Sequence, residues 1–409
     1  MNRITITVLL VLSGVGGCSS MLRVDPGPPI ELGLSAESLT KARWVDGAFV
    51  VSEADAERIY SFDGERFSLR ASLPTSEAAM SGEIAVHAAD WQNDAWPMAI
   101  AGTTRCVGEC LMMSYNIELK LETLAMADDE TALGIRAELS ARAEGESRRV
   151  SLYDVVVLRG AGQLVARWPL EEPRTLLEEQ KLVLRSGVSS TSLHKLGGHW
   201  YALAMYEVKD LRSMADTSVH VLHALEHRKN SLLRTDRALL LRNGEEFWCL
   251  NAEGRKLFVR RWGVDDGGQA STLDTLSAAL PVADYDGARW LSAVALGKGE
   301  LALVSGIGHW YGVLSRAGAW VQAPQGSELA VELQAVGTKR AFLSEQSAGE
   351  ARFQELKASG LDEAAFSLPA GSDCSWQLLE GAGKLWGLQR CQAEPKFSLH
   401  RLDLSAPGR

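Results

Sequence analysis

The sequence predicts an all-β protein that folds as one β-propeller of seven or eight blades over residues 35–409. Short apolar kernels recur along the chain and are separated by Gly, Asp, Asn or charged turns. Represented by one residue each, they lie mostly 35 to 53 residues apart, at Phe49, Ile84, Val155, Trp200, Trp248, Leu301, Phe342 and Trp386. A propeller blade is one supersecondary unit of about 40 to 50 residues, so this spacing indicates blades. The wider gap, between Ile84 and Val155, would hold one extra unit around LMMSY.

The residue types within these units favour strands. Segments such as SVHVLHAL, RRVSLYDVVVL and RKLFVRRW are rich in β-branched or aromatic residues and partly alternate between apolar and polar. The stretch LKLETLAMADDETALGIRAELSARAEG could form a helix or a long outer hairpin, and the alternation of Ile135, Ala137, Leu139 and Ala141 favours strand. Tandem β-sandwich domains are the alternative architecture. The absence of a Pro- or Ser-rich linker in the middle of the sequence favours a single ring.

Two short repeats support an internally repetitive chain. GGHWYALA at 197–204 and GIGHWYGVL at 306–314 share Gly-His-Trp-Tyr, and Ala-Arg-Trp occurs at 42–44, 166–168 and 288–290. The Ala-Arg-Trp spacings correspond to about three blades each, whereas the Gly-His-Trp-Tyr spacing falls between two and three blade lengths.

The N-terminal stretch has the order of parts found in an export signal. Arg3 gives a short positive region, and Ile4 to Leu12 form an apolar segment that is too short to span a bilayer. Val15-Gly16-Gly17-Cys18 then resembles the lipobox of bacterial lipoproteins. This resemblance implies that residues 1–17 are a signal peptide and that Cys18 becomes the lipidated N-terminus. It also implies a diacylglycerol on the Cys18 sulfur and an acyl chain such as palmitate on the amine. An ordinary secretory signal or a buried first strand is the alternative.

The residues after Cys18 suggest the final location. Ser19 stands where a lipoprotein retained in the inner membrane would carry Asp, so the resemblance implies the outer membrane, facing the periplasm or the cell surface. Residues 18–34 are Pro/Gly-rich and polar, which predicts a flexible linker between lipid and domain.

The remaining cysteines suggest disulfides, which an exported protein can keep. Cys374 and Cys391 bracket a strand–turn–strand pattern whose midpoint lies in the turn, so they are expected opposite each other across a hairpin. Cys106 and Cys110 flank Val-Gly-Glu and predict a second bridge at a hairpin tip. Four reduced, buried thiols remain the alternative, and Cys249 in FWCL is expected in the core.

Trp and His residues are interpreted mainly as structural. The twelve Trp residues are spread over nearly every proposed blade, which is expected if they pack between neighbouring blades. Trp91 and Trp96, in DWQNDAWP, are the better candidates for an exposed contact surface. His220, His223 and His227 would share one face of a helix and could bind a metal, but the flanking residues favour a strand, which separates them.

Motifs for catalysis or cofactor binding are weak, and we predict no catalytic, metal or cofactor-binding residues. The mature chain has no Gly-x-Ser-x-Gly elbow and no HExxH. Stretches such as Gly160-Ala161-Gly162 and Asp265-Asp266-Gly267-Gly268 are interpreted as turns.

Charge and fold together leave two hypotheses for function. With 42 Lys+Arg against 52 Asp+Glu and no cluster of basic residues, the chain is not expected to bind nucleic acid. We favour a binding or scaffold module, tethered to the membrane through Cys18, for a protein or an envelope glycan. Its layout is similar to that of the propeller lipoprotein of the outer-membrane β-barrel assembly machinery. The alternative is a propeller-type hydrolase or lyase with acidic residues around the central channel.

Overall fold

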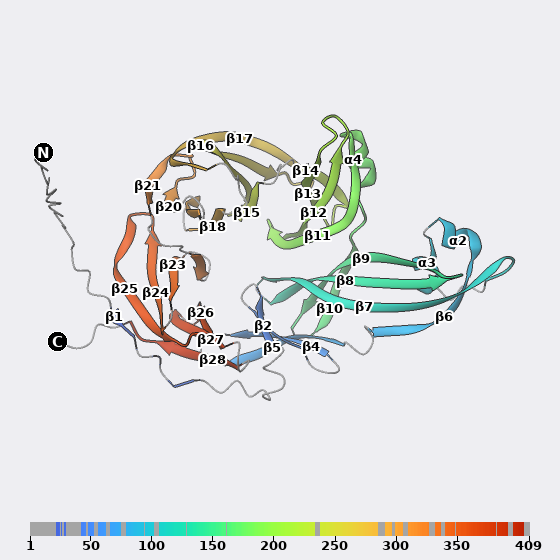
Figure 1. The fold of residues 1–409 in the computed structure, drawn as a ribbon, viewed down its shortest axis with the longest axis horizontal. Coiled ribbons are helices and arrows are strands. Elements are labelled where there is room, and N and C mark those ends of the chain that lie inside the picture. The colour runs from blue at the N-terminus through green and yellow to red at the C-terminus, as the bar shows by residue number, and fades with distance from the viewer. Residues whose placement is uncertain are drawn as a thin grey trace, which may run out of the picture.

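The protein is an all-β ring of seven blades, as the computed structural model shows (Figure 1). The structure describes residues 22–24, 26, 28–29, 42–45, 48–52, 56–62, 66–74, 79–93, 95–101, 106–127, 129–160, 162–233, 238–284, 291–296, 299–305, 310–326, 332–336, 340–347, 349–381, 383–391 and 396–404. Each blade is one sheet, and the blades follow one another in chain order. The prediction of a single propeller is confirmed, with seven blades.

The first four blades come from the N-terminal two thirds of the chain. Blade one contains β2 (Ala42–Val45), β3 (Ala48–Ser52), β4 (Ala56–Phe62) and β5 (Phe67–Pro74). Blade two contains β6 (Ala79–His87), β7 (Cys110–Ala127), β8 (Glu130–Ala143), β9 (Glu146–Arg159) and β10 (Gln163–Pro169). Blade three contains β11 (Leu182–Leu196), β12 (His199–Asp210), β13 (Asp216–Ala224) and β14 (Lys229–Leu233). Blade four contains β15 (Leu239–Asn243), β16 (Glu246–Val264) and β17 (Ala270–Asp284).

The last three blades complete the ring. Blade five contains β18 (Leu291–Ala295), β19 (Leu301–Ser305), β20 (Trp310–Leu314) and β21 (Trp320–Gly326). Blade six contains β22 (Glu332–Val336), β23 (Arg340–Ser347), β24 (Gly349–Lys357) and β25 (Gly360–Ala370), and blade seven β26 (Cys374–Gly381), β27 (Lys384–Cys391) and β28 (Lys396–Leu402). Of the helices within the described residues, α2 (Ala88–Gln92) and α3 (Trp96–Ala101) lie in blade two and α4 (Arg174–Glu179) lies between blades two and three.

The apolar kernels of the sequence are mostly the second strands of the blades. Those at Phe49, Trp200, Trp248, Leu301, Phe342 and Trp386 lie on β3, β12, β16, β19, β23 and β27. The expectation of an extra unit around LMMSY is wrong, because Ile84 and Val155 lie on β6 and β9 of the same enlarged blade. The long alternating stretch that could have been helix forms β7 and β8, as its alternation predicted.

The short sequence repeats do not mark equivalent positions. Trp200 and Tyr201 lie on the second strand of blade three, whereas Trp310 and Tyr311 lie on the third strand of blade five. Ala-Arg-Trp forms part of a first strand at 42–44 and of a fourth strand at 166–168, and 288–290 lies outside the described residues. This explains why the Gly-His-Trp-Tyr spacing does not equal a whole number of blades.

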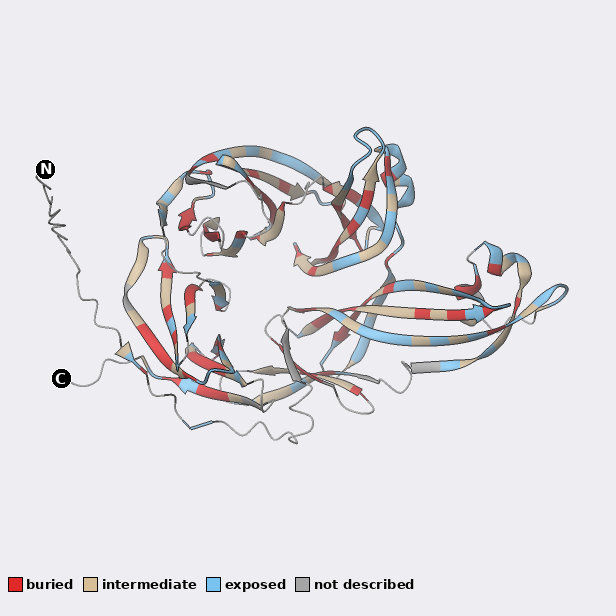
Figure 2. Cartoon of the chain, viewed as in Figure 1, coloured by how far each residue is buried: buried red, intermediate tan, exposed pale blue. Residues whose placement is uncertain are grey.

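A separate apolar cluster fills each interface between neighbouring blades. Seven clusters join the seven pairs of neighbours, and an eighth lies in the part of blade two that leaves the ring (Figure 2). Trp residues contribute to most of these interfaces, as predicted. Trp200 packs between blades two and three, Trp248 and Trp310 between four and five, and Trp376 between six and seven.

The ring closes through side chains of its first and last blades. Phe49 and Val51 of β3 pack with Trp386 and Leu388 of β27 and with Leu399 of β28. The Phe62 and Trp386 rings meet edge to face at 5.0 Å between centroids, a favourable aromatic geometry.

The N-terminal segment contacts a different blade. The short strand β1 (Leu22–Arg23) pairs in parallel with β25 and becomes the outermost strand of blade six. Val24 is 4% exposed and lies in the cluster between blades six and seven, and its N–H donates to the Ser367 carbonyl at 3.0 Å. Leu22–Val24 fall within the expected flexible linker, but they are docked because their apolar side chains reach this cluster.

Removing one side chain from the closing interface should weaken the whole ring. We expect Phe49→Ala to lower the free energy of unfolding by about 3 to 5 kcal/mol, because Phe49 is fully buried between the first and last blades. Chemical denaturation followed by tryptophan fluorescence measures the change. Leu164→Ala, at a site that is 59% exposed, is the control and should change the value by less than about 0.5 kcal/mol. If both substitutions lowered the free energy of unfolding by the same amount, the closing interface would not have the expected importance for stability.

Candidate functional site

Blade two extends out of the ring as an arm, which is the main departure of the fold from a regular propeller (Figure 1). We define the arm as β6, α2, α3, residues 106–118, residues 138–143 of β8 and residues 146–151 of β9. In this region β6 pairs with β7, β7 with β8 and β8 with β9, all antiparallel. The strands β7 and β8 continue into the ring without a break, so the arm is a direct extension of the blade.

The arm has an apolar core of its own. Trp91 and Trp96 from the two helices pack on Met113, Leu139 and Val86, and all five side chains are buried. Trp91 and Trp96 are therefore not exposed contact residues, and that interpretation of DWQNDAWP is wrong. Gln92 and Asn93 between them in the sequence are exposed, whereas the two rings, with centroids 5.7 Å apart, fill the space between helices and sheet.

Polar contacts fix Trp91 to the end of β9. The Trp91 indole N–H donates to Glu146 Oε2 at 3.0 Å. The Arg148 guanidinium lies over the Trp91 ring, 4.8 Å from its centroid, and also donates to the Trp91 carbonyl. Glu146 in turn pairs with Arg148 at 3.2 Å. Because Trp91 lies on α2 and its partners on β9, these contacts hold the helices against the sheet.

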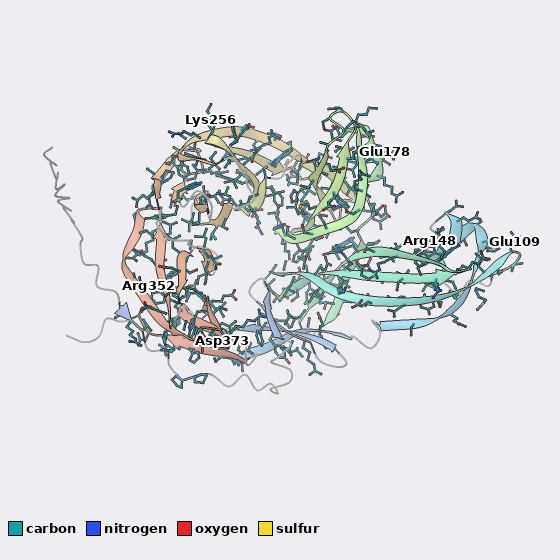
Figure 3. The ribbon with its side chains drawn as sticks, in the orientation of Figure 1. Glu109, Arg148, Glu178, Lys256, Arg352 and Asp373 are labelled. Atoms are coloured by element: carbon teal, nitrogen blue, oxygen red, sulfur yellow. A yellow bond between two sulfur atoms is a disulfide. The ribbon has the colours of Figure 1, made fainter. Side chains whose placement is uncertain are left out.

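Both predicted disulfides form, and one of them lies in the arm. Cys106–Cys110 closes a short loop at the start of β7, and the Ala88 N–H donates to the Glu109 carbonyl at 3.1 Å. The predicted position at a hairpin tip is wrong, because residues 97–101 (PMAIA) lie in α3 rather than in a strand, and the disulfide lies between that helix and β7. Glu109 marks the far end of the arm in Figure 3.

The second disulfide has the predicted geometry. Cys374 and Cys391 are direct partners in the β26–β27 hairpin of blade seven, with their Cα atoms 4.0 Å apart. Cys249 is buried in the cluster between blades three and four, as expected for a core residue. Cys18 lies outside the described residues.

The root of the arm is packed tightly against blade three. The Thr123 hydroxyl donates to the Thr191 carbonyl at 2.6 Å, and Arg136 donates to the Val188 carbonyl and lies 3.2 Å from Glu122. Gly134 is required at this place, since a Cβ atom there would lie 2.2 Å from the Tyr153 hydroxyl oxygen. These contacts make the arm a rigid extension rather than a hinged one.

A half-buried carboxylate reinforces the same interface. Glu130, whose side chain is 13% exposed, lies 2.6 Å from Lys195 of blade three and 2.7 Å from Arg159. Hydrogen bonds from Lys195 and Arg159 lower the pKa of Glu130 to about 2, because they favour its charged form.

One face of the arm offers a polar hollow of about 390 Å³. Two rows of aligned residues, Ser114–Arg142–Ser147 and Asn116–Ser140–Arg149, form its centre across β7, β8 and β9. Within the described part of the chain, neither Arg142 nor Arg149 has an ion-pair partner, and both side chains are exposed. Hydroxyl, amide and guanidinium groups can bind hydroxyl, carbonyl or carboxylate oxygens of a partner.

The tip adds exposed apolar side chains to this polar face. Val107, inside the disulfide loop, is 76% exposed, and Met112 on β7 is 64% exposed. The disulfide limits the loop conformations, so little conformational entropy is lost when Val107 contacts a partner. The arm therefore combines a preorganised apolar tip with hydrogen-bond donors that have no partner in the ring.

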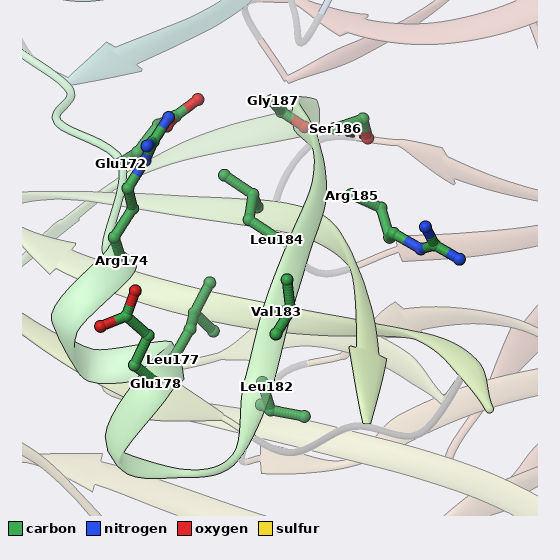
Figure 4. Close-up of a pocket in the computed structure, with 10 residues that line it drawn as sticks. All are labelled: Glu172, Arg174, Leu177, Glu178, Leu182, Val183, Leu184, Arg185, Ser186 and Gly187. Carbon is green, nitrogen blue, oxygen red and sulfur yellow. Dashed lines mark hydrogen bonds and ion pairs between the residues drawn. The ribbon is translucent and has the colours of Figure 1, made fainter. Parts of the chain in front are cut away.

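A second hollow, of about 310 Å³, lies between α4 and the start of β11 (Figure 4). Leu177 and Leu182 are buried at its base, and Glu172 and Arg174 form an ion pair of 2.9 Å at its edge. The charges of Glu172 and Arg174 thus partly neutralise each other within the protein. Leu177 belongs to the cluster between blades two and three, so α4 serves to cover this end of blade three.

The histidine group of blade three is dispersed, as the strand interpretation predicted. His220 and His223 lie on β13 and project to opposite faces of the sheet, and His227 lies in the following turn. Burial lowers the pKa of both His220 and His223 to about 4, so both are neutral at pH 7. His223 lies 3.2 Å from the Tyr206 hydroxyl. Among the described residues, no group of His, Cys, Asp or Glu side chains could hold a metal ion.

The first strands of blades four to seven, β15, β18, β22 and β26, contact one another in that order. Their polar groups bind neighbouring blades: Gln334 of β22 donates to the Trp376 carbonyl at 3.2 Å and accepts from the Leu378 N–H at 3.0 Å. The Gln334 side chain thus serves as a contact between blades six and seven.

The candidate loops behave as turns where they are described. Asp265 Oδ1 accepts from the N–H groups of Gly267 and Gln269, which is a local turn pattern. Gly160 and Gly162 have positive φ angles in the turn between β9 and β10.

None of the described helices is long and apolar enough to cross a membrane.

Comparisons with known proteins add only weak similarities. No protein-family model matches the chain, and no curated protein matches it in sequence. Among solved structures, the Dos1 propeller has a TM-score of 0.38 at 8% identity, covering 86% of this chain and 74% of that chain. The WD40 domain of SCAP from fission yeast has a TM-score of 0.38 at 8% identity, covering 88% and 81%. Virginiamycin B lyase from Staphylococcus aureus has a TM-score of 0.35 at 8% identity, covering 71% and 100%. Similarities of this size carry no information on function.

The pKa of Glu130 makes the root of the arm sensitive to acid. Because the pKa is lowered in the folded state, the stabilisation is complete above the usual value of 4.5 and is lost as the pH falls toward 2. We expect Glu130→Gln to lower the melting temperature at pH 7 and to reduce its dependence on pH between 4.5 and 2. Calorimetry over this range measures both effects. Glu178→Gln, at an exposed site on α4, is the control, and a steep pH dependence that survives in Glu130→Gln would contradict this role.

Proposed function

We propose that the protein is a non-enzymatic binding module, tethered by a lipid on Cys18 to the outer membrane, and that its arm recognises a protein or an envelope glycan. The propeller then serves as the rigid support of the arm. The observation that carries this proposal is the arm itself, an extension of one blade that the closure of the ring does not require.

Two properties of the arm support a role in recognition. Its own core, its disulfide and the contacts around Trp91 maintain its shape beyond the ring. At the same time, Arg142 and Arg149 remain without an ion-pair partner in the described part of a chain whose net charge is -10. Exposed guanidinium groups beside hydroxyl and amide groups are suited to binding acidic or hydroxyl-rich groups of a partner.

The envelope location is supported by the sequence and by the cysteine chemistry. Val15-Gly16-Gly17-Cys18 matches the lipobox pattern, and Ser19 matches the pattern of outer-membrane destination. The two disulfides are compatible with an oxidising compartment. The lipid would keep the module at the membrane while the arm contacts its partner.

Charge reversal on the arm should remove partner binding and leave the fold intact. We expect the amount of partner crosslinked to the tagged protein in living cells to fall at least tenfold in the double variant Arg142→Glu/Arg149→Glu. Both side chains are exposed hydrogen-bond donors that line the hollow. Arg255→Glu/Lys256→Glu, at exposed sites on β16, is the matched control with the same change in charge. It should crosslink as the wild type does.

The outcomes separate the parts of the proposal. A reproducible partner lost only in the arm variant supports recognition by the arm, whereas equal loss in both variants would contradict it. A purified monomer that turns over glycans or esters would contradict the non-enzymatic role. The anchor is tested separately: if Cys18→Ala still fractionates with membranes and the wild type carries no acyl mass, the lipid tether is wrong.

A further inference from the structure

The docked N-terminal segment fixes the place where the chain leaves the ring. Leu22 and Arg23 pair with Phe366 and Ser367 of β25, and Val24 is buried between blades six and seven. These contacts combine sheet hydrogen bonds with apolar burial, so residues 22–24 belong to the ring and not to the tether. The chain therefore leaves the ring at the outer edge of blade six.

Only three residues, Ser19 to Met21, separate Cys18 from β1 in the sequence. Cys18 precedes Leu22 by four residues, which span at most about 14 Å when fully extended. If all of residues 18–34 were flexible, the typical separation of the ends would be about 23 Å and the maximum near 60 Å. Docking of β1 thus restricts both the distance and the orientation of the ring relative to the lipid.

The arm lies on the other side of the ring. Blade two is three blades away from blade six in one direction and four in the other, which is the largest separation possible in a ring of seven. Figure 1 shows β1 and the arm at opposite ends of the long axis of the molecule. A surface that holds the edge of blade six therefore leaves the arm free.

We infer that the outer edge of blade six, formed by β1 and β25, is the membrane-facing surface of the protein and that the arm projects away from the lipid. This inference rests on the proposed lipid anchor at Cys18 and adds the orientation of the module. Arg352 of the neighbouring strand β24 is paired with Glu350 at 3.0 Å, so the inference does not depend on its charge. The short segment between Cys18 and β1 selects it.

Energy transfer to the membrane surface tests this orientation. The full-length, acylated protein is placed in phosphatidylethanolamine/phosphatidylglycerol vesicles that contain an acceptor dye on the lipid headgroup. A donor dye is attached through one bioorthogonal residue at Arg352, Lys256 or Glu109, which lie on blade six, on blade four and at the arm tip (Figure 3). We expect the transfer efficiency to fall in the order 352, 256, 109, with at least a twofold difference between the first and last positions.

Two changes to the chain separate docking from folding. Val24→Asp places a carboxylate in the apolar cluster and should release β1, so the transfer efficiencies at the three positions should converge. Insertion of a Gly/Ser segment of about 15 residues between Ser20 and Met21 should have the same effect without touching the ring, because it adds about 20 Å of typical reach. Val321→Asp, at a site that is 47% exposed, is the control and should keep the wild-type order.

Failure of the anchor and failure of the orientation give different results. A wild-type protein without acyl mass would contradict the proposed anchor. An acylated protein with equal transfer at positions 352 and 109, or an order unchanged by the Gly/Ser insertion, would overturn the membrane-facing role of blade six.

Discussion

The structure depends on apolar contact between neighbouring blades. Side chains alternate across each strand, so one strand supplies residues to two interfaces. On β23, Phe342 packs toward blade seven, whereas Ala341 and Leu343 pack toward blade five. The closing interface between Phe49, Trp386 and Leu399 obeys the same rule and completes the circle through side chains of the two blades. Because each interface buries residues from two sheets, the stability of a blade cannot be separated from that of its neighbours.

This constraint explains which parts of the fold could be predicted from the sequence. In blades one and three to seven the second strand is largely buried on both faces, so it forms a continuous apolar kernel, whereas β7 of blade two is mostly exposed. The sequence predicted these kernels at Phe49, Trp200, Trp248, Leu301, Phe342 and Trp386. The Cys374–Cys391 pair could be predicted because hairpin register follows from counting residues around a turn. The number of blades could not be fixed, because the arm interrupts the period within blade two.

The candidate site was less predictable for a physical reason. Trp91 and Trp96 lie in a polar stretch of sequence, and their burial depends on β7, β8 and β9 folding beneath them. The polar hollow combines Ser, Asn and Arg residues from three strands, and no local pattern brings Asn116, Ser140 and Arg149 together before the register is known. Likewise, the docking of Val24 depends on a cluster more than three hundred residues later in the chain.

Rigidity links the two ends of the molecule. An isolated hairpin is only marginally stable in water, so a projecting arm loses its shape unless it has a core and a fixed root. The arm has both: Trp96 and Met113 fill its core, and Thr123 and Arg136 attach its root to blade three. Apolar clusters join each pair of neighbouring blades between the arm and β1. The packing of the blades therefore fixes the position of Val107 at the arm tip relative to Val24 at blade six. When a partner binds a surface that is already held in one orientation, little conformational entropy is lost on binding. A long, flexible tether would lose that entropy on binding, whereas here it is lost when the chain folds.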